Sequence, residues 1–331
     1  CNYRCSYCWP YARSDKKDHR PTELCLLTID EIKRQARERG FNSFHFSLSG
    51  GEPTFHPGYL DILKHLADDT SNTNYTSVHM TSNCSRNMKW FEQYVKTVAP
   101  FHRASITASY HREHVNTQEK REQFADKLCF VQEHDVQVTI NQVMVPERFD
   151  ELWEDANYFH DRGINVTLKP QSDPTASFVV DGYTPRMLEV LHNGMPQQDF
   201  TEKKREVIRP KSKFKHRIAE NGQHYQIEMR DKHGKTWRLD QAERFNAFGF
   251  NKFKDWTCSS GYRSIIIREP DGYIKRSYSC SDTPLGHIQS GFRLFDQPMP
   301  CISESCVSSA DSKITKRKPT YGERLLSICM Y

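Results

Sequence analysis

Apolar and polar residues alternate along the chain with two periods. Period-two runs predict strands near 44–49, 77–81, 104–109, 136–144 and 164–169. Helical periodicity between them predicts helices near 57–68, 86–98, 117–134 and 147–161. Because strands alternate with helices, we expect an α/β fold with a parallel sheet and helical crossovers.

Four further elements are predicted from local signals. Thr28-Ile29-Asp30-Glu31 has the pattern of a capping box and predicts a helix from there to about Arg39. Thr184 and Pro185 predict the start of a short helix near 185–192. Residues 223–239 alternate as a hairpin that turns at 231–234, and 265–274 indicate a second strand–turn–strand unit.

Composition limits the class of protein. The 331 residues leave room for two domains, and hydrophobic residues make up only 36% against 27% charged residues. No apolar run approaches the roughly 20 residues that cross a bilayer, so we expect no membrane partner. Eleven cysteines in a chain of this length favour metal sites in a reducing cytoplasm over a disulfide scaffold.

Charge is unevenly distributed. Residues 203–217 hold eight Lys or Arg and one Glu, a charge of +7 (eight minus one), whereas the whole chain carries +5. A solvated surface is the simplest interpretation. Docking of nucleic acid, of an acidic substrate or of an acidic electron donor such as flavodoxin is the functional alternative.

Three cysteines open the chain, as Cys1-Asn2-Tyr3-Arg4-Cys5-Ser6-Tyr7-Cys8. Three thiolates this close suit a metal centre with one open coordination position. Structural zinc sites usually close with a fourth nearby ligand, and the next candidate, His19, is eleven positions away. The trio therefore favours an iron–sulfur cluster, with zinc as the alternative.

A glycine-rich turn follows the first predicted strand. Gly50-Gly51-Glu52-Pro53 places two glycines, which allow close backbone approach, before a carboxylate. Such a turn can bring the backbone close to a ligand. An ordinary strand-to-helix loop is the alternative for this turn taken alone.

Together the two motifs resemble the radical S-adenosylmethionine (radical SAM) superfamily. The resemblance implies that Cys1, Cys5 and Cys8 hold a [4Fe-4S] cluster whose open iron binds S-adenosylmethionine. It places Tyr7 near the adenine and Gly50, Gly51 and Glu52 near the methionine amino group. It also implies a partial (β/α)6 barrel, with one strand expected upstream of Cys1, and a reductant such as flavodoxin or ferredoxin.

Polar residues follow the predicted strands, where ligands of such sheets gather. Ser109 and Asn141 match strand ends at which family members contact the cofactor, and we expect them to do so here. Cys84 follows Thr81-Ser82-Asn83 and is a candidate hydrogen-atom donor to a substrate radical. Burial as an inert thiol is the alternative for Cys84. Cys25, Cys129 and Cys329 lie among apolar residues and are expected to pack.

A second cysteine group, Cys258, Cys280, Cys301 and Cys306, has gaps of 21, 20 and 4 residues. Zinc ribbons show close Cys-x-x-Cys pairs, which this group lacks, although zinc stays an alternative. Four thiols around a hairpin resemble the twitch or SPASM-like extension of radical SAM enzymes, which binds an auxiliary [4Fe-4S] cluster. Ser277 stands where many SPASM sequences have a further cysteine, so one auxiliary cluster is expected.

The resemblance implies three segments and one type of chemistry. We expect a barrel over 1–171, a basic linker with a hairpin over 172–255, and a small twitch/SPASM-like domain over 256–331. The enzyme would generate a 5′-deoxyadenosyl radical that takes hydrogen from a C–H bond of a peptide or small molecule. A nucleoside, sugar or nucleic-acid base is the alternative substrate, and an iron–sulfur or zinc module that binds nucleic acid is the non-enzymatic alternative.

Overall fold

A computed structural model gives the fold of the chain. It describes residues 1–8, 19–68, 75–172, 179–192, 227–230, 233–239, 251–267, 272–280, 284–306 and 308–318. The basic run at 203–217, the turn residues 231–232 and Cys329 lie outside these residues. The chain divides into two compact units, Cys1–Leu26 with Asn42–Lys215 and Leu27–Phe41 with His216–Tyr331.

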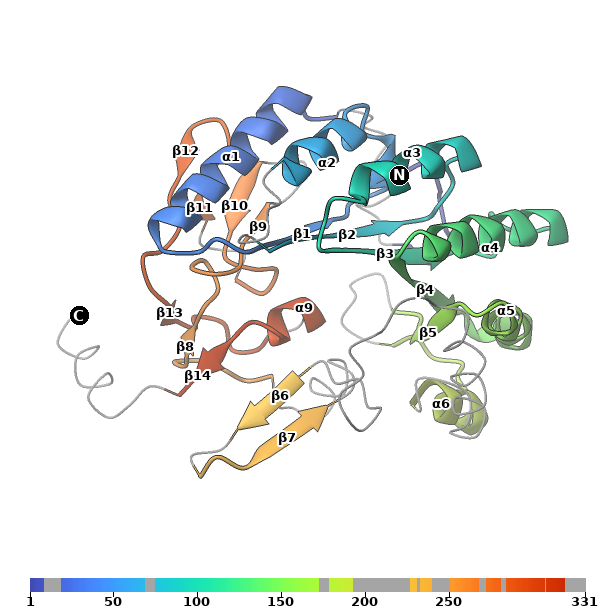
Figure 1. Ribbon diagram of the computed structural model, residues 1–331. Coiled ribbons are helices and arrows are strands. Elements are labelled where there is room, and N and C mark those ends of the chain that lie inside the picture. The colour runs from blue at the N-terminus through green and yellow to red at the C-terminus, as the bar shows by residue number, and fades with distance from the viewer. Residues whose placement is uncertain are drawn as a thin grey trace. The chain divides into compact units, whose positions relative to one another are not determined.

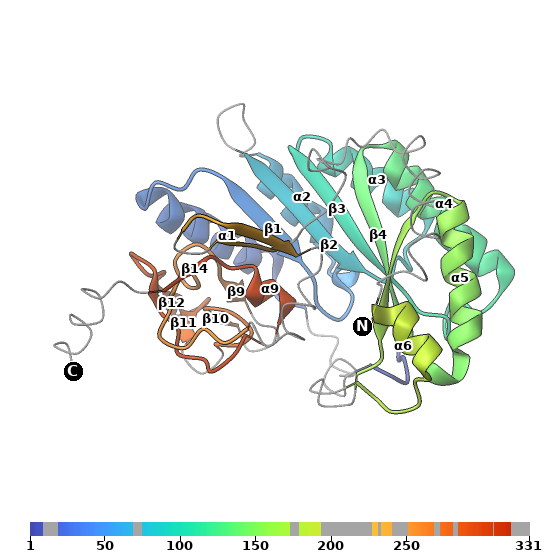
Figure 2. The same ribbon diagram turned by 90° about the horizontal axis from the view of Figure 1, so that it is seen from below.

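The first unit contains a five-stranded parallel sheet in the order β1-β2-β3-β4-β5 (Figure 1). Its strands are Phe44–Leu48, Thr76–Ser82, Arg103–Tyr110, Val136–Met144 and Asn165–Pro170. The crossovers between them are α2 (Tyr59–Ala67), α3 (Met88–Val98), α4 (Gln118–Glu133) and α5 (Phe149–Asp161), which lie along one side of the sheet (Figures 1 and 2). The predicted α/β class is confirmed, and every predicted strand end lies within one residue of the observed one.

The strands bury alternate side chains, which is why their period could be recognised. Met80, Ile106 and Ile140, one on each of β2, β3 and β4, are at most 1% exposed. The residues directly before and after each of them are half-exposed. Side chains also cap two of the crossover helices. Asn87 accepts a hydrogen bond from the Trp90 amide at the start of α3, and Thr117 accepts one from Lys120 at the start of α4.

The predicted start of the first helix is wrong. Helix α1 spans Thr22–Glu38 and begins six residues before Thr28, which is buried within it. The first turn forms directly after Pro21, whose carbonyl accepts hydrogen bonds from the amides of Leu24 and Cys25. Leucines in this segment are good helix formers, and they continue the helix through the expected capping box. Helix α6 (Pro185–His192) lies where it was predicted.

A buried carboxylate joins the end of β3 to two crossover helices. Asp155 on α5 is fully buried and accepts a hydrogen bond from the Tyr110 hydroxyl at 2.8 Å. It also pairs with Arg112 and with Arg121 of α4, each at 2.7 Å. Arg112 belongs to the loop that leaves β3, so this network fixes the start of that loop.

Asp155→Ala is expected to lower the free energy of unfolding by about 3–5 kcal/mol, because two guanidinium groups lose their buried partner. Urea denaturation with circular dichroism measures it. Asp150→Ala is the matched control on the same helix, since Asp150 is 73% exposed and pairs with an equally exposed Arg186. We expect less than about 1 kcal/mol for the control. Equal losses in both variants would contradict the assigned role of the network.

The second unit consists of small sheets. A four-stranded antiparallel sheet has the order β12-β11-β10-β9 and a three-stranded sheet the order β13-β8-β14. The predicted hairpin appears as β6 (Ile227–Arg230) and β7 (Thr236–Leu239), and the predicted strand–turn–strand unit as β9 (Ile266–Ile267) and β10 (Tyr273–Lys275). The other elements are β8 (Thr257–Cys258), β11 (Pro284–His287), β12 (Gly291–Phe292), β13 (Met299–Pro300), α9 (Ser309–Ser312) and β14 (Lys316–Arg317).

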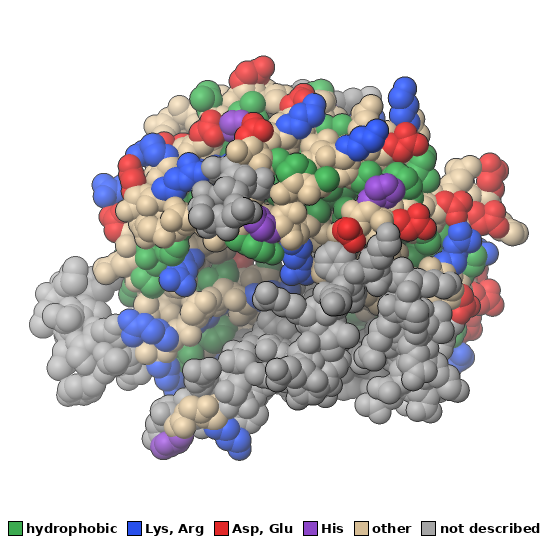
Figure 3. Space-filling view, in the orientation of Figure 1, with side chains coloured by type: hydrophobic (Ala, Val, Ile, Leu, Met, Phe, Trp, Pro, Cys, Tyr) green, Lys and Arg blue, Asp and Glu red, His purple; other side chains and the backbone are tan. Residues whose placement is uncertain are grey.

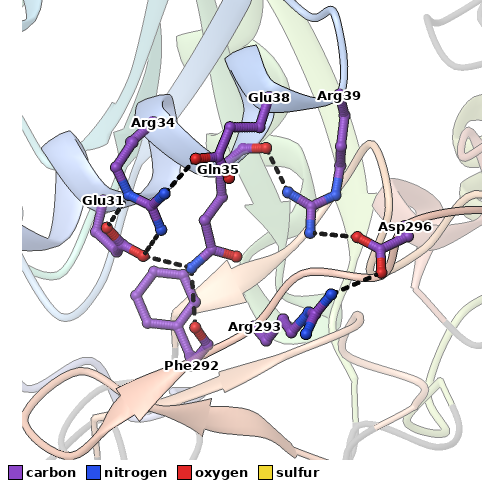
Figure 4. Close-up of a pocket in the computed structure, with 8 residues that line it drawn as sticks. All are labelled: Glu31, Arg34, Gln35, Glu38, Arg39, Phe292, Arg293 and Asp296. Carbon is purple, nitrogen blue, oxygen red and sulfur yellow. Dashed lines mark hydrogen bonds and ion pairs between the residues drawn. The ribbon is translucent and has the colours of Figure 1, made fainter.

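The C-terminal half of α1 belongs to this second unit and binds the segment after β12 (Figure 4). The Gln35 amide donates to the carbonyl of Phe292 and accepts from the amide of Leu294, both at 2.8 Å. The pocket beside these contacts has three acidic and three basic side chains, which pair with one another and leave no net charge for a ligand. They are Glu31, Arg34, Glu38, Arg39, Arg293 and Asp296.

The surface of the described residues is mixed in charge. Figure 3 shows acidic and basic side chains side by side, with apolar side chains between them in small groups. Large exposed apolar side chains, such as Leu27 at 66% and Tyr278 at 56%, occur at separate positions. Within the described residues, no helix has the length and apolar character that a bilayer crossing requires.

Candidate functional site

The cysteine loop lies against the turn that follows β1. A β-carbon on Gly51 would stand 2.6 Å from the backbone nitrogen of Cys1, so only glycine allows this approach. The loop turns at its end, where the Cys8 amide donates to the Cys5 carbonyl at 3.1 Å. Cys5 is buried, Cys8 half-buried and Cys1 exposed. The structure therefore brings the two predicted motifs together.

The carboxylate of Glu52 is buried and fully occupied by protein donors. One oxygen accepts hydrogen bonds from the Thr54 hydroxyl at 2.6 Å and the Ser82 hydroxyl at 2.8 Å. The other accepts the Asn83 amide at 2.6 Å. Glu52 thus joins the turn after β1 to the end of β2.

Asn83 extends this connection to the cysteine loop. Its side-chain amide donates to the Asn2 side chain at 2.8 Å and lies 3.9 Å from the Cys1 sulfur. Asn2 in turn donates to the Ser85 hydroxyl at 3.0 Å. The first cysteine is therefore held by the loop that follows β2.

The loop after β3 holds the rest of the cysteine segment, and the sequence analysis did not assign it this role. The Glu113 carboxylate accepts hydrogen bonds from the Ser6 amide, at 2.8 Å, and from the Ser6 hydroxyl. The His114 ring accepts the Arg4 amide at 3.3 Å and stacks on Tyr3 with ring centres 4.0 Å apart. The sequence signal for this role was the run of polar residues directly after the predicted strand at 104–109.

Tyr7 and His111 form a neutral hydrogen-bonded pair. The Tyr7 hydroxyl lies 2.8 Å from Nδ1 of His111, and the two rings stack. Burial raises the pKa of Tyr7, and burial followed by repulsion from His114 lowers the pKa of His111 to about 4. Both side chains are therefore uncharged near pH 7. An uncharged aromatic pair offers a surface on which a flat ring can stack.

The environment of Cys5 disfavours a bare thiolate. Burial and then the nearby Glu113 carboxylate raise its pKa to about 11. A bound metal reverses this balance, because coordination deprotonates a thiol directly. The Cys5 sulfur, a Glu113 oxygen and a His114 nitrogen lie within 4.8 Å of one another. Glu113 and His114 already accept hydrogen bonds from the loop, so they serve first as its anchors.

Polar side chains cover the other side of the parallel sheet. Ser109 and Asn141, both expected to bind cofactor, are direct neighbours in register near the carboxyl ends of β3 and β4. Both are half-exposed. Cross-strand rows of polar residues lie on this face, among them Ser47-His79-Ser105-Gln137, Thr81-Thr107-Thr139-Asn165 and Ser109-Asn141-Thr167.

Cys84, the candidate hydrogen donor, is only 1% exposed. Its thiol donates to the Ser82 carbonyl at 3.7 Å, and burial together with the Glu52 carboxylate raises its pKa to about 12. Lys127 donates to the Cys84 carbonyl at 2.6 Å and so stabilises the positive φ of +52°. These contacts place Cys84 in the core, and its role as a donor stays a prediction.

Four further thiols gather in the second unit. Cys301 packs in one buried cluster with Cys258, Cys306 and Phe253, and contact with Cys301 raises the pKa of Cys280. Strand β8 pairs Cys258 with Met299 of β13 and with Lys316 of β14. The four cysteines that the sequence analysis grouped are each at most 4% exposed: Cys258, Cys280, Cys301 and Cys306.

Hydrogen bonds hold the segments around three of these cysteines. The amide of Cys301 donates to Trp256 at 2.7 Å, and that of Cys306 donates to Asn251 at 2.8 Å. The Asp311 carboxylate accepts the amide and the hydroxyl of Ser279, each at 2.6 Å, beside Cys280. Asp311 is itself buried, so it anchors the loop that carries this cysteine.

The comparisons with known proteins agree with the geometry of the first unit. Residues 1–159 match the family model described as the Radical SAM superfamily. This part of the chain belongs to that superfamily, whose members are enzymes. Members of the superfamily use a [4Fe-4S] cluster and S-adenosylmethionine. No curated protein sequence matches the chain significantly.

Glu52→Ala is expected to lower the free energy of unfolding by about 1–3 kcal/mol for each buried donor left without a partner. It should also weaken S-adenosylmethionine binding, because the turn after β1 loses its connection to β2. Chemical denaturation of the metal-free protein and equilibrium binding to the reconstituted protein measure the two effects. Unchanged stability would contradict the positioning role, and cofactor affinity lost with stability intact would instead indicate direct contact.

Proposed function

We propose that Cys1, Cys5 and Cys8 hold the [4Fe-4S] cluster that binds S-adenosylmethionine. The observation that carries the proposal is the attachment of the cysteine loop at the carboxyl ends of β1, β2 and β3. Gly51 approaches Cys1, Asn83 contacts Asn2, and Glu113 binds Ser6. Fixed backbone on three sides keeps three thiols in place while leaving a further coordination position free.

The rest of the cofactor site follows from the same arrangement. The backbone of Gly50 and Gly51 offers acceptors for the methionine ammonium group, and Glu52 holds that backbone in position. Tyr7 and His111 provide an uncharged aromatic surface for the adenine. Ser109 and Asn141 lie at strand ends where they can donate to and accept from the ribose or the carboxylate.

When bound, the cluster and S-adenosylmethionine supply a one-electron cleavage that yields methionine and a 5′-deoxyadenosyl radical able to take hydrogen from a substrate C–H bond. The chain contributes orientation, through the polar face of the sheet. Hydroxyl, imidazole and amide groups on that face suit a polar substrate, either a peptide or a small molecule. A nucleoside, sugar or nucleic-acid base is the second candidate for the same chemistry.

The four buried thiols of the second unit form the proposed auxiliary centre of a twitch/SPASM-like domain. We propose that these thiols hold a [4Fe-4S] cluster, with a single zinc ion as the alternative. The cluster would bind substrate or pass electrons, and a cytoplasmic flavodoxin or ferredoxin would supply the reducing electron.

Cys5→Ala is expected to abolish both the first cluster and the formation of 5′-deoxyadenosine, since two thiolates cannot replace three. Anaerobic reconstitution followed by dithionite and S-adenosylmethionine, with chromatography of the nucleoside, measures it. Cys129→Ala is the control, because this thiol is half-buried and donates to the Arg162 carbonyl, away from both groups of proposed ligands. Nucleoside formation by the Cys5 variant at the control's rate would refute the ligand assignment.

Cys280→Ala is expected to reduce bound iron from about eight to about four atoms per chain, as one of two [4Fe-4S] clusters is lost. Cleavage of S-adenosylmethionine should continue, because the first unit keeps its own ligands. Iron analysis and Mössbauer spectroscopy decide the outcome. An iron content equal to that of the unsubstituted protein would exclude the auxiliary cluster.

A further inference from the structure

A buried guanidinium lies beside the four thiols of the second unit. Arg276 is 3% exposed and follows β10, four residues before Cys280. Its Nε donates to the Ser260 carbonyl at 3.3 Å, and its Nη2 donates to the Pro300 carbonyl at 3.1 Å. Ser260 comes two residues after Cys258, and Pro300 directly precedes Cys301. One side chain thus connects the segments that carry three of the four cysteines.

Within the described residues, Arg276 has no acidic partner. It donates to neutral carbonyls, and its guanidinium carbon lies 5.2 Å from the centre of the Phe295 ring. The one buried carboxylate nearby, Asp311, accepts hydrogen bonds from Tyr278 and Ser279 instead. A buried charge without an opposite charge costs several kcal/mol of stability. If the four thiols nearby were protonated and neutral, the guanidinium would still lack an opposite charge and this cost would remain.

The neighbouring residues leave little free space around the Arg276 side chain. Gly261 has a φ of +85°, and a β-carbon there would lie 2.7 Å from the Phe295 ring and 3.1 Å from the Arg276 side chain. The Ser260 hydroxyl donates to the Arg276 carbonyl at 2.7 Å, so the backbone of Arg276 is held as well as its side chain. The guanidinium therefore has one defined position.

We infer that Arg276 is the positioning residue and buried counter-charge of the four-cysteine centre. This inference rests on the proposed function, since it requires a metal group at these thiols. Four thiolates around a [4Fe-4S] core carry a net negative charge, which offsets the guanidinium. One-electron reduction adds a further negative charge, and a fixed nearby cation stabilises it, which raises the reduction potential.

The decisive test is a redox titration of this centre alone. The full chain with Cys1, Cys5 and Cys8 replaced by Ala keeps the second group as its only proposed cluster ligands. Its iron content is measured, and its midpoint potential is followed by electron paramagnetic resonance. Arg276→Gln and Arg276→Lys are compared in this background. Arg263→Gln is the matched control, because Arg263 is an exposed arginine of the same unit that lies over Phe41.

Arg276→Gln is expected to disfavour reduction at least tenfold, a shift of about 59 mV to more negative potential for a one-electron couple. Arg276→Lys should shift less, and Arg263→Gln should not shift. If Arg276→Gln binds no iron while Arg276→Lys does, the need for a positive charge is supported directly. Full iron with an unchanged potential in Arg276→Gln, or equal loss of iron in both variants, overturns the inference.

Failure of the proposed function gives a different result. If the background protein itself binds neither iron nor zinc, the auxiliary centre is wrong whatever the Arg276 variants do. If it binds zinc, the proposed auxiliary [4Fe-4S] cluster is wrong. The effect of the Arg276 charge is then measured as the affinity of the site for zinc. Arg276→Gln should then bind zinc at least tenfold more weakly than Arg263→Gln, and equal affinities would overturn the role of Arg276.

Discussion

The attachment of the cysteine loop depends on one buried carboxylate. Glu52 is 6% exposed, and its carboxylate accepts hydrogen bonds from the Ser82 hydroxyl and the Asn83 amide, which join the turn after β1 to the end of β2. Asn83 reaches Asn2 from that same strand end. Gly51 contacts Cys1 on the other side. A buried acceptor that satisfies several donors is costly to replace, so the site's geometry is set before any cofactor binds.

The fold of the first unit could be predicted because its signals are local. Strands with one buried and one half-exposed face produce a period of two, and β1 to β5 were found from it. The start of α1 was missed because the capping signal at Thr28 also occurs inside a helix that Pro21 and the following leucines start earlier. Two signals in the sequence each predict a start for this helix, and the sequence alone does not show which one the chain uses.

The candidate site could be predicted only where its motifs are contiguous. The cysteine loop and the Gly50-Gly51-Glu52 turn each lie within a few residues, so their spacing is visible. Glu113 and His114 contact residues 107 and 110 positions away, and no local pattern reports such a contact. Arg276 is missed for the same reason, since its role depends on carbonyls of Ser260 and Pro300 that the fold brings to it.

The two groups of thiols differ in the charge placed beside them. Glu113 lies next to Cys5 and adds to the burial that raises its pKa. In the second group, hydrogen bonding to Cys301 and burial raise the pKa of Cys280, but Arg276 opposes them. Local negative charge disfavours reduction of a bound cluster and local positive charge favours it. If both groups hold clusters, these charges make the first the stronger reductant, as cleavage of a sulfonium requires, and the second the better electron acceptor.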